Sequence, residues 1–371
     1  MAKLVMSEEE TMLADSAAGF LEAAAPIGKF RAMRDAGQTH DAGLWQEMVA
    51  QGWAGVLVPE DAGGSDMGFA AANVLAHEMG KTLAMSPFLS TAVIAVTALR
   101  QVSSERANET LARIAAGEAT YALAVDEGIK FDPDSTAMAA AADGNGFRLN
   151  GKKQFVVDGA MADRLLVLAR TADGLTLFDI AADAAGISRE ASSMIDARDA
   201  ARITFENVEA TGDDVLGQVD NAMTVLKPAL QAGQAALAAE MSGLATAAFG
   251  MTVGYLKERK QFGVEIGRFQ ALQHRAAHLW CEIEVTASAI LNAGRMLDSD
   301  PDNAELAVSL AKARATSTAQ LAVVEGVQMH GGIGMTDAFD MGFFMKRARV
   351  GAEWLGDYSY HAEKVAALRG F

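Results

Sequence analysis

Two helical regions enclose a run of short strands in this sequence of 371 residues. Across residues 119–217, β-branched runs are separated by pairs in which aspartate or asparagine precedes glycine. Such pairs favour the positive φ angles of tight hairpin turns. They are Asp143-Gly144, Asn150-Gly151, Asp158-Gly159 and Asp173-Gly174. Several short strands at this spacing predict an antiparallel β domain in the middle of the chain.

Helical patterns occupy both flanks of this region. Ser7, with Glu10 three residues later, is typical of a capping box that begins a helix. Further helices are predicted over residues 41–51, 68–81, 88–99 and 104–117. Between Pro228 and Pro301 no proline interrupts a helical apolar period, which predicts long helices. The α–β–α order predicts domains at residues 1–117, 118–217 and 218–371.

Composition and charge exclude several classes of protein. The net charge of −17 repels nucleic acid and acidic membrane surfaces, so neither is an expected partner. No run of about 18 uncharged apolar residues is present, which predicts no membrane span. The N-terminus lacks the apolar core of a signal peptide, and Cys281 is the single cysteine. We therefore expect a cytoplasmic protein without disulfides.

General catalytic and metal-binding motifs are weak. His274 and His278 have the spacing of half a zinc site, but Arg275 stands where a metalloprotease motif needs glutamate. Ser309 and Lys312 match a short S-x-x-K pattern that arises easily by chance. Neither a phosphate-binding loop nor a G-x-G-x-x-G motif is present. No metal site is predicted, and the sequence argues against a Rossmann nucleotide domain.

Two C-terminal segments suit a phosphate-containing cofactor. Arg259 stands at a predicted helix end before a tight turn, and a guanidinium can donate two hydrogen bonds at once to a diphosphate. The second segment runs from Gln328 to Gly334 and contains three glycines. Their backbone N–H groups allow a phosphate or a ribose to approach closely.

The order of these segments and the α–β–α layout resemble the acyl-CoA dehydrogenase family of flavoproteins over essentially the whole chain. The R-x-x-FG motif at Arg259 and the Q-x-x-GG-x-G motif at Gln328 are the most specific. Other stretches similar to family motifs are Val58-Pro59-Glu60 with Gly63-Gly64, Glu78-Met79-Gly80-Lys81, Leu149-Asn150-Gly151-Lys152-Lys153-Gln154-Phe155, and Phe205-Glu206-Asn207-Val208 with Leu216-Gly217.

The resemblance implies an α+β fold with an N-terminal helical domain, a middle antiparallel β-barrel and a C-terminal four-helix bundle. It implies FAD as the cofactor and oxidation of an acyl-CoA thioester to its 2,3-enoyl form. In this reaction a carboxylate removes the α proton while the β hydrogen leaves as hydride to flavin N5. The expected acceptor of the electrons is an electron-transfer flavoprotein.

The resemblance also implies an oligomer, a dimer or tetramer, in which one chain holds the flavin ring and a neighbour clasps the ADP half. The positions that match the clasp are Arg259, Gln261, Phe262, Gln270, Gln328, Gly331 and Gly332. Phe155, Val156 and Val157 match the strand beside the flavin ring.

The other family positions depart from the pattern. The family's T-E-P-x-x-G-S-D loop is replaced by Ala124-Val125-Asp126-Glu127-Gly128-Ile129-Lys130, and Val157 stands where a threonine faces the flavin. Leu355 and Gly233 occupy the two positions at which the family places its catalytic glutamate, and Gln234 replaces an arginine near CoA.

Neither leucine nor glycine can accept a proton, so both base positions are empty. Glu240 and Asp357 are the nearby acids that could substitute, although each could equally be a solvated or capping acid. Three readings stay open. The chain is a non-catalytic subunit of a mixed tetramer, a homo-oligomeric dehydrogenase with a relocated base, or a flavin oxidase or monooxygenase on the same fold.

Overall fold

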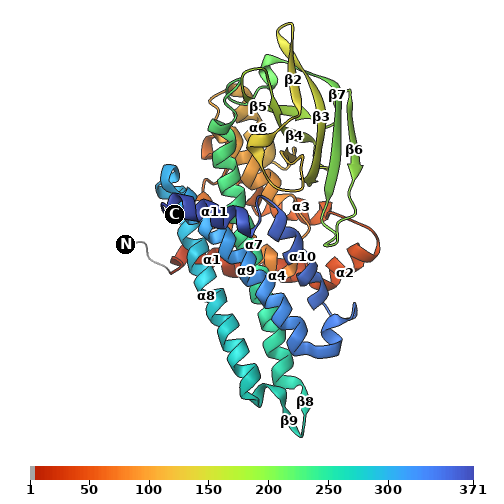
Figure 1. Ribbon diagram of the computed structural model, residues 1–371, viewed down its shortest axis with the longest axis vertical. Helices are drawn as coiled ribbons and strands as arrows, with labels where there is room; N and C mark the ends of the chain where they lie inside the picture. Colours follow the sequence, from red (N-terminus) through yellow and green to blue (C-terminus); the bar gives the residue numbers. More distant parts are fainter. Residues whose placement is uncertain (1–4) are drawn as a thin grey trace. The chain divides into compact units, whose positions relative to one another are not determined.

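The computed structural model describes residues 5–371 of the chain, which form two compact units. The helical unit consists of the described residues up to Ala32, Phe69–Ala84 and Gln234–Phe371. The sheet unit consists of Met33–Gly68 and Met85–Gly233. Helices precede and follow the strands along the chain, so the predicted α+β class is confirmed (Figure 1). The predicted domain limits stay a prediction.

The helices before the strands begin with a confirmed capping box. The Ser7 hydroxyl accepts from Glu10 N at 3.1 Å, and the Glu10 carboxylate accepts from Ser7 N at 2.6 Å. The helices are α1 (Glu8–Ala24), α2 (Ile27–Asp35), α3 (Ala42–Ala50), α4 (Gly68–Thr82), a π-helix (Phe88–Ala95) continued by α5 (Val96–Arg100), and α6 (Glu105–Ala115).

Seven strands form one sheet in the sheet unit, in the order β1-β4-β2-β3-β7-β6 with β5 paired to β4. They are β1 (Tyr121–Ala124), β2 (Ala139–Asp143), β3 (Gly146–Val157), β4 (Arg164–Arg170), β5 (Leu175–Ala181), β6 (Ile187–Ala191) and β7 (Ala200–Ala210). Most neighbours are antiparallel, as predicted. The pairings of β4 with β1 and with β2 are parallel. The long connection from β1 to β4, which includes the β2–β3 hairpin, allows this direction where a tight turn would not.

Two of the four predicted turn pairs form hairpin turns, and two do not. Asp143-Gly144 turns between β2 and β3, and Asp173-Gly174 turns between β4 and β5. Asn150-Gly151 is no turn, because it lies inside β3 at a register shift against β7. Asp158-Gly159 follows the end of β3 without making a hairpin, because β3 pairs with β2 and β7 instead of β4.

The helices after the sheet are α7 (Met223–Glu258), α8 (Gln270–Ser299), α9 (Glu305–His330), α10 (Met341–Glu353) and α11 (Tyr358–Leu368). A short hairpin of β8 (Lys260–Gln261) and β9 (Val264–Glu265) joins α7 to α8 (Figure 1). Pro228 lies within the first turns of α7 rather than before it. By length and composition α7 could cross a membrane, but 67% of its most apolar window is buried, as in a core helix.

Two glycines allow α4 and α7 to pack closely within the helical unit. A Cβ on Gly80 would lie 2.0 Å from the carbonyl oxygen of Glu240, and one on Gly243 would lie 1.8 Å from that of His77. No side chain fits at either position without moving a backbone. This crossing fixes the part of α7 that follows Gln234.

Candidate functional site

The β8–β9 hairpin presents Arg259 at the end of α7. Its carbonyl oxygen accepts from Ile266 N at 2.8 Å, which closes the hairpin base. Its guanidinium is exposed and, among residues 5–371, has no hydrogen bond or ion pair. The neighbouring Lys260 and Arg268, in contrast, both pair with Glu265, at 3.6 and 2.7 Å. Arg259 is therefore the cation of this hairpin that is available to a ligand.

Aromatic rings flank the same hairpin. Phe262, at the turn, is 92% exposed and has a positive φ of 56°. It contacts the ring of Phe269 edge-on, with centroids 6.1 Å apart. Gln261 donates from its amide to the Lys260 carbonyl oxygen, and Gln270 is the exposed first residue of α8.

The glycine-rich segment begins at the end of α9, in the same unit as Arg259. Gly331 has φ 64° and ψ −138°, a region that only glycine enters readily. A Cβ on Gly331 or Gly332 would meet nothing within 4 Å, so open space lies over the backbone there. Gln328 is exposed one turn earlier. An available guanidinium and an open glycine backbone fit the ADP half of FAD, with its diphosphate and ribose.

An aromatic stack supports this segment from within the protein. The His330 ring lies between Tyr255 and Phe339, with centroid distances of 4.5 Å to each. Its Nδ1 lies 2.6 Å from the Gly326 carbonyl oxygen. Because a carbonyl only accepts, Nδ1 carries the proton. The stack joins the ends of α7 and α9, which carry Arg259 and Gly331.

The strand that resembles the flavin-facing one is the end of β3. Phe155 has a positive φ of 52° and lies at a register shift between Lys153 and Val156, so the strand is redirected there. Val156 and Val157 are buried. Valine has no hydroxyl, so the Val157 side chain offers no hydrogen bond to a flavin.

The loop after β1 is bonded to the chain itself. The ammonium of Lys153, 1% exposed, donates to the Val125 carbonyl oxygen at 3.0 Å and to the Glu127 carboxylate at 2.6 Å. Glu127 also accepts from the backbone N–H groups of Ala137 and Met138. Burial raises the pKa of Glu127, but the bonds from Lys153 and these N–H groups outweigh it and hold the pKa below its usual value.

Two further residues complete the closure of this loop. Gln154 donates from its backbone to Asp126 O at 2.8 Å and from its side chain to Gly128 O at 2.6 Å. Burial raises the pKa of Asp126 to about 6, against the opposing charge of Lys153. The Glu127 carboxylate and the loop's carbonyl oxygens are thus bonded within the protein itself, so a flavin ring would find no free acceptor among these groups.

The residues at the two predicted base positions are both buried. Gly233 and Gln234 are consecutive residues in the first third of α7, and both are buried. Leu355, 2% exposed, has a positive φ of 58° in the turn between α10 and α11. The Gln234 side chain donates to the Leu355 carbonyl oxygen at 3.1 Å. The structure therefore brings together Gln234 and Leu355, which the sequence placed 121 residues apart.

Both substitute acids have structural partners. The Glu240 carboxylate, 7% exposed, lies 3.3 Å from the Arg347 guanidinium, which is itself buried. The Asp357 carboxylate accepts from Tyr360 N at 2.8 Å and caps α11. An acid that is ion-paired or that caps a helix is not poised to take a proton from a substrate. Among residues 5–371, no three histidine, cysteine or acidic side chains gather to hold a metal ion.

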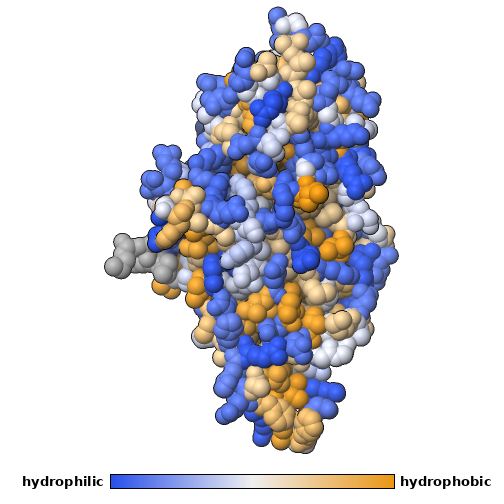
Figure 2. Space-filling model, viewed as in Figure 1, coloured by the Kyte–Doolittle hydropathy of each residue, from blue (hydrophilic) through white to orange (hydrophobic). Residues whose placement is uncertain are grey.

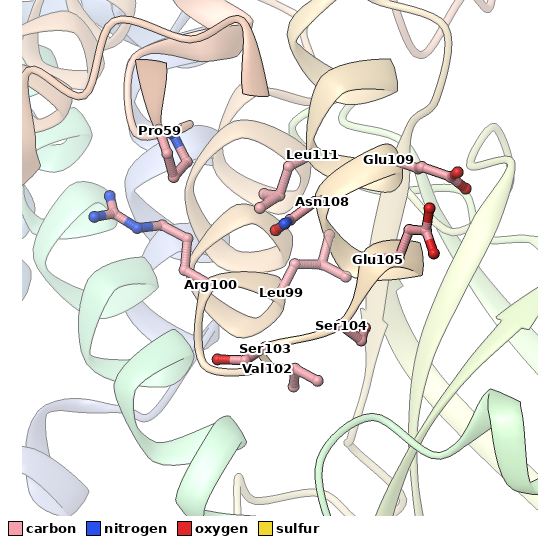
Figure 3. Close-up of a pocket in the computed structure, with 10 residues that line it drawn as sticks. All are labelled: Pro59, Leu99, Arg100, Val102, Ser103, Ser104, Glu105, Asn108, Glu109 and Leu111. Atoms are coloured by element: carbon pink, nitrogen blue, oxygen red, sulfur yellow. The ribbon is translucent and has the colours of Figure 1, made fainter. Parts of the chain in front are cut away.

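A groove of about 730 Å³ lies elsewhere in the sheet unit, between Pro59 and the helices α5 and α6 (Figure 3). Arg100, at its edge, already donates to the Leu57 carbonyl oxygen and pairs with Asp66 at 2.9 Å. Glu105 and Glu109 line the α6 side. None of the predicted site residues lines this groove.

Comparison with known proteins covers nearly the whole chain. Residues 7–118, 122–208 and 222–368 match the N-terminal, middle and C-terminal domains of acyl-CoA dehydrogenases. The acyl-CoA dehydrogenase IpdE2 of Mycobacterium tuberculosis is 31% identical, over 94% of this chain and 93% of its own length.

Solved structures are similar over the same extent. A variant of the steroid ACAD Tcur3481-Tcur3483 is 30% identical over 98% of both chains, with a TM-score of 0.88. The ChsE4-ChsE5 complex from Mycobacterium tuberculosis shares the fold, with a TM-score of 0.91 at 22% identity over 100% of both chains.

Proposed function

This chain belongs to the acyl-CoA dehydrogenase family, and we propose that it is the non-catalytic subunit of a dehydrogenase built from two unlike chains. The assembly would oxidise an acyl-CoA thioester to its 2,3-enoyl form. When bound, FAD supplies the hydride acceptor for this reaction. Arg259, Gln328, Gly331 and Gly332 would hold the ADP half of an FAD whose flavin ring lies in the partner chain.

The turn at Leu355 carries this proposal. Its backbone is formed and held, but its side chain is aliphatic and cannot take the α proton. Loss of a general base typically lowers a rate by about 10²–10⁴-fold. Because Glu240 and Asp357 are engaged elsewhere, the base would come from another chain. A homo-oligomer with a relocated base is the reading that the test below must exclude.

Surface and family features agree with a partner chain. Trp280 and Val285 on α8 and Val324 on α9 are 52%, 55% and 60% exposed, so large apolar side chains of these two helices are available to a partner chain. Figure 2 also shows apolar residues gathered around the end of the helical unit that carries β8 and β9. The steroid ACAD that is 30% identical to this chain has the double name Tcur3481-Tcur3483, which agrees with two unlike chains. From this relative we propose that the substrate has a bulky, steroid-like acyl group. From the family we propose that an electron-transfer flavoprotein accepts the electrons.

The test compares the FAD content of two preparations. The chain is purified alone and after co-expression with a dehydrogenase chain that retains the catalytic glutamate. We expect a colourless or weakly coloured protein alone, and a yellow mixed assembly in the second preparation. In the assembly, Glu→Gln in the partner should abolish turnover while the colour remains. A fully flavinylated, active protein from this chain alone would overturn the proposal.

A further inference from the structure

Buried side chains from three helices hold the turn that joins α10 to α11. Gln234 of α7 and His361 of α11 both lie 3.1 Å from the Leu355 carbonyl oxygen. Lys312 of α9 donates from its ammonium to the carbonyl oxygens of Gly351, at 3.0 Å, and Gly356, at 3.1 Å. We call Gln234, Lys312 and His361 the carbonyl clamp.

The clamp is unusual because its strongest donor is a fully buried lysine. Lys312 is 0% exposed, and within residues 5–371 it forms no ion pair, although the charges of Glu353 and Asp357 attract it at longer range. Its third contact is the Thr316 hydroxyl, at 3.3 Å. A buried ammonium is costly unless several acceptors surround it. Here two of the three acceptors are backbone carbonyls of one short segment, so the amino group is committed to shaping that segment.

The turn itself adopts a backbone that its sequence disfavours. Leu355 has a φ of 58°, where a side chain with a Cβ is strained. Gly356 follows with a φ of 101°, and a Cβ there would lie 2.5 Å from the Tyr360 ring and 2.8 Å from His361 Nε2. A leucine persists in this conformation only where surrounding contacts determine it. The clamp bonds the carbonyls of residues 355 and 356 and so provides those contacts.

We propose that the carbonyl clamp, with Lys312 at its centre, is a positioning device that fixes the backbone of residue 355 whatever side chain that residue carries. The clamp contacts only carbonyl oxygens of the turn, and none of its bonds involves the Leu355 side chain. The backbone of the turn is therefore set independently of the side chain at residue 355, and a glutamate there would point in the same direction as the leucine. This inference rests on the proposed function only in assigning the family's base position to residue 355.

Hydrogen exchange of the 351–358 amides, followed by mass spectrometry, tests the inference in the wild-type chain and its variants. Lys312→Met should speed exchange of these amides at least about tenfold, because the turn loses two of its bonds. The matched control is Thr318→Val, which removes the buried Thr286–Thr318 bond at 2.7 Å on the same helix. It should leave exchange of the turn within about threefold of wild type.

A rescue separates positioning from general destabilisation. Glycine adopts positive φ without being held, so the rescue is a smaller effect of Lys312→Met on exchange of the turn in a Leu355→Gly background than in the wild-type background. In this comparison the cavity left by the buried leucine cancels. If Lys312→Met does not fold, Gln234→Leu replaces it with the same rescue. Equal exchange in the Lys312→Met and Thr318→Val proteins, or no rescue by glycine, would overturn the inference. A wild-type chain that oxidises acyl-CoA alone would refute the proposed function and leave these exchange results valid.

Discussion

Replacement of Arg259 by alanine should weaken FAD retention without unfolding the protein. The guanidinium is exposed and unbonded within residues 5–371, so its loss should change the free energy of unfolding by no more than about 0.5 kcal/mol. A hydrogen bond to a charged diphosphate contributes about 1.5–3 kcal/mol. The dissociation constant for FAD should therefore rise roughly 10- to 150-fold, since about 1.4 kcal/mol corresponds to a factor of ten.

The assay follows FAD release from the mixed assembly on dilution, by the rise in flavin fluorescence, with ADP as a competitor. Arg268→Ala is the matched control, because it removes the same charge from the same hairpin. The Arg268 guanidinium already pairs with Glu265 at 2.7 Å, so its loss should change FAD affinity by less than about threefold. Equal weakening by the two variants would mean that only net charge matters, and would refute the clasp assigned to Arg259.

Two further outcomes follow from the structure. Burial lowers the pKa of Lys312 from 10.5 to about 7, so the unfolded chain binds the extra proton between these values. Stability should then rise with pH by up to about 1.4 kcal/mol per unit from pH 7 to 10.5, and urea unfolding at three pH values should show that Lys312→Met removes this slope. Gly80→Ala, whose Cβ would lie 2.0 Å from the Glu240 carbonyl oxygen, should lower the free energy of unfolding by about 1–3 kcal/mol and therefore lower the Tm. Gly19→Ala is the control, because its Cβ would meet nothing within 4 Å, and it should not lower the Tm.

Helix starts were predictable because their signals are local. The Ser7 and Glu10 side chains form the predicted capping box, and Ser104 caps α6 through a bond from Ala107 N at 3.1 Å. Asp41 likewise caps α3. Each of these contacts spans three residues, so the sequence alone contains both partners.

Strand pairing and register depend on partners that lie far apart in sequence, and they were only partly predictable. The parallel pairing of β1 with β4 cannot be predicted from the pattern of apolar and polar residues in either strand. Asn150-Gly151 has the composition of a hairpin turn but lies within β3, where a Cβ on Gly151 would approach Met138 to 2.8 Å. Glycine is needed there for close approach, a reason that a turn pattern does not distinguish.

The candidate site could be predicted where short family motifs mark its residues. It could not be predicted where a buried charged side chain determines the local structure. Arg259 and Gly331 lie in one unit with the exposure and open space that a ligand needs. Lys153 and Lys312, by contrast, are lysines at 1% and 0% exposure, although lysine is almost always a surface residue. Their acceptors are mostly backbone carbonyls, which every residue possesses, so the short patterns that contain these lysines do not indicate that their side chains are buried.

We propose that this chain has the FAD clasp but no base of its own. The most direct test of this function is the visible spectrum of the protein purified alone, supplemented with FAD and mixed anaerobically with a set of acyl-CoA thioesters that includes steroid-like ones. We expect that no thioester bleaches the flavin absorbance. Bleaching by any of them would show a complete active site in this chain and contradict the proposed function.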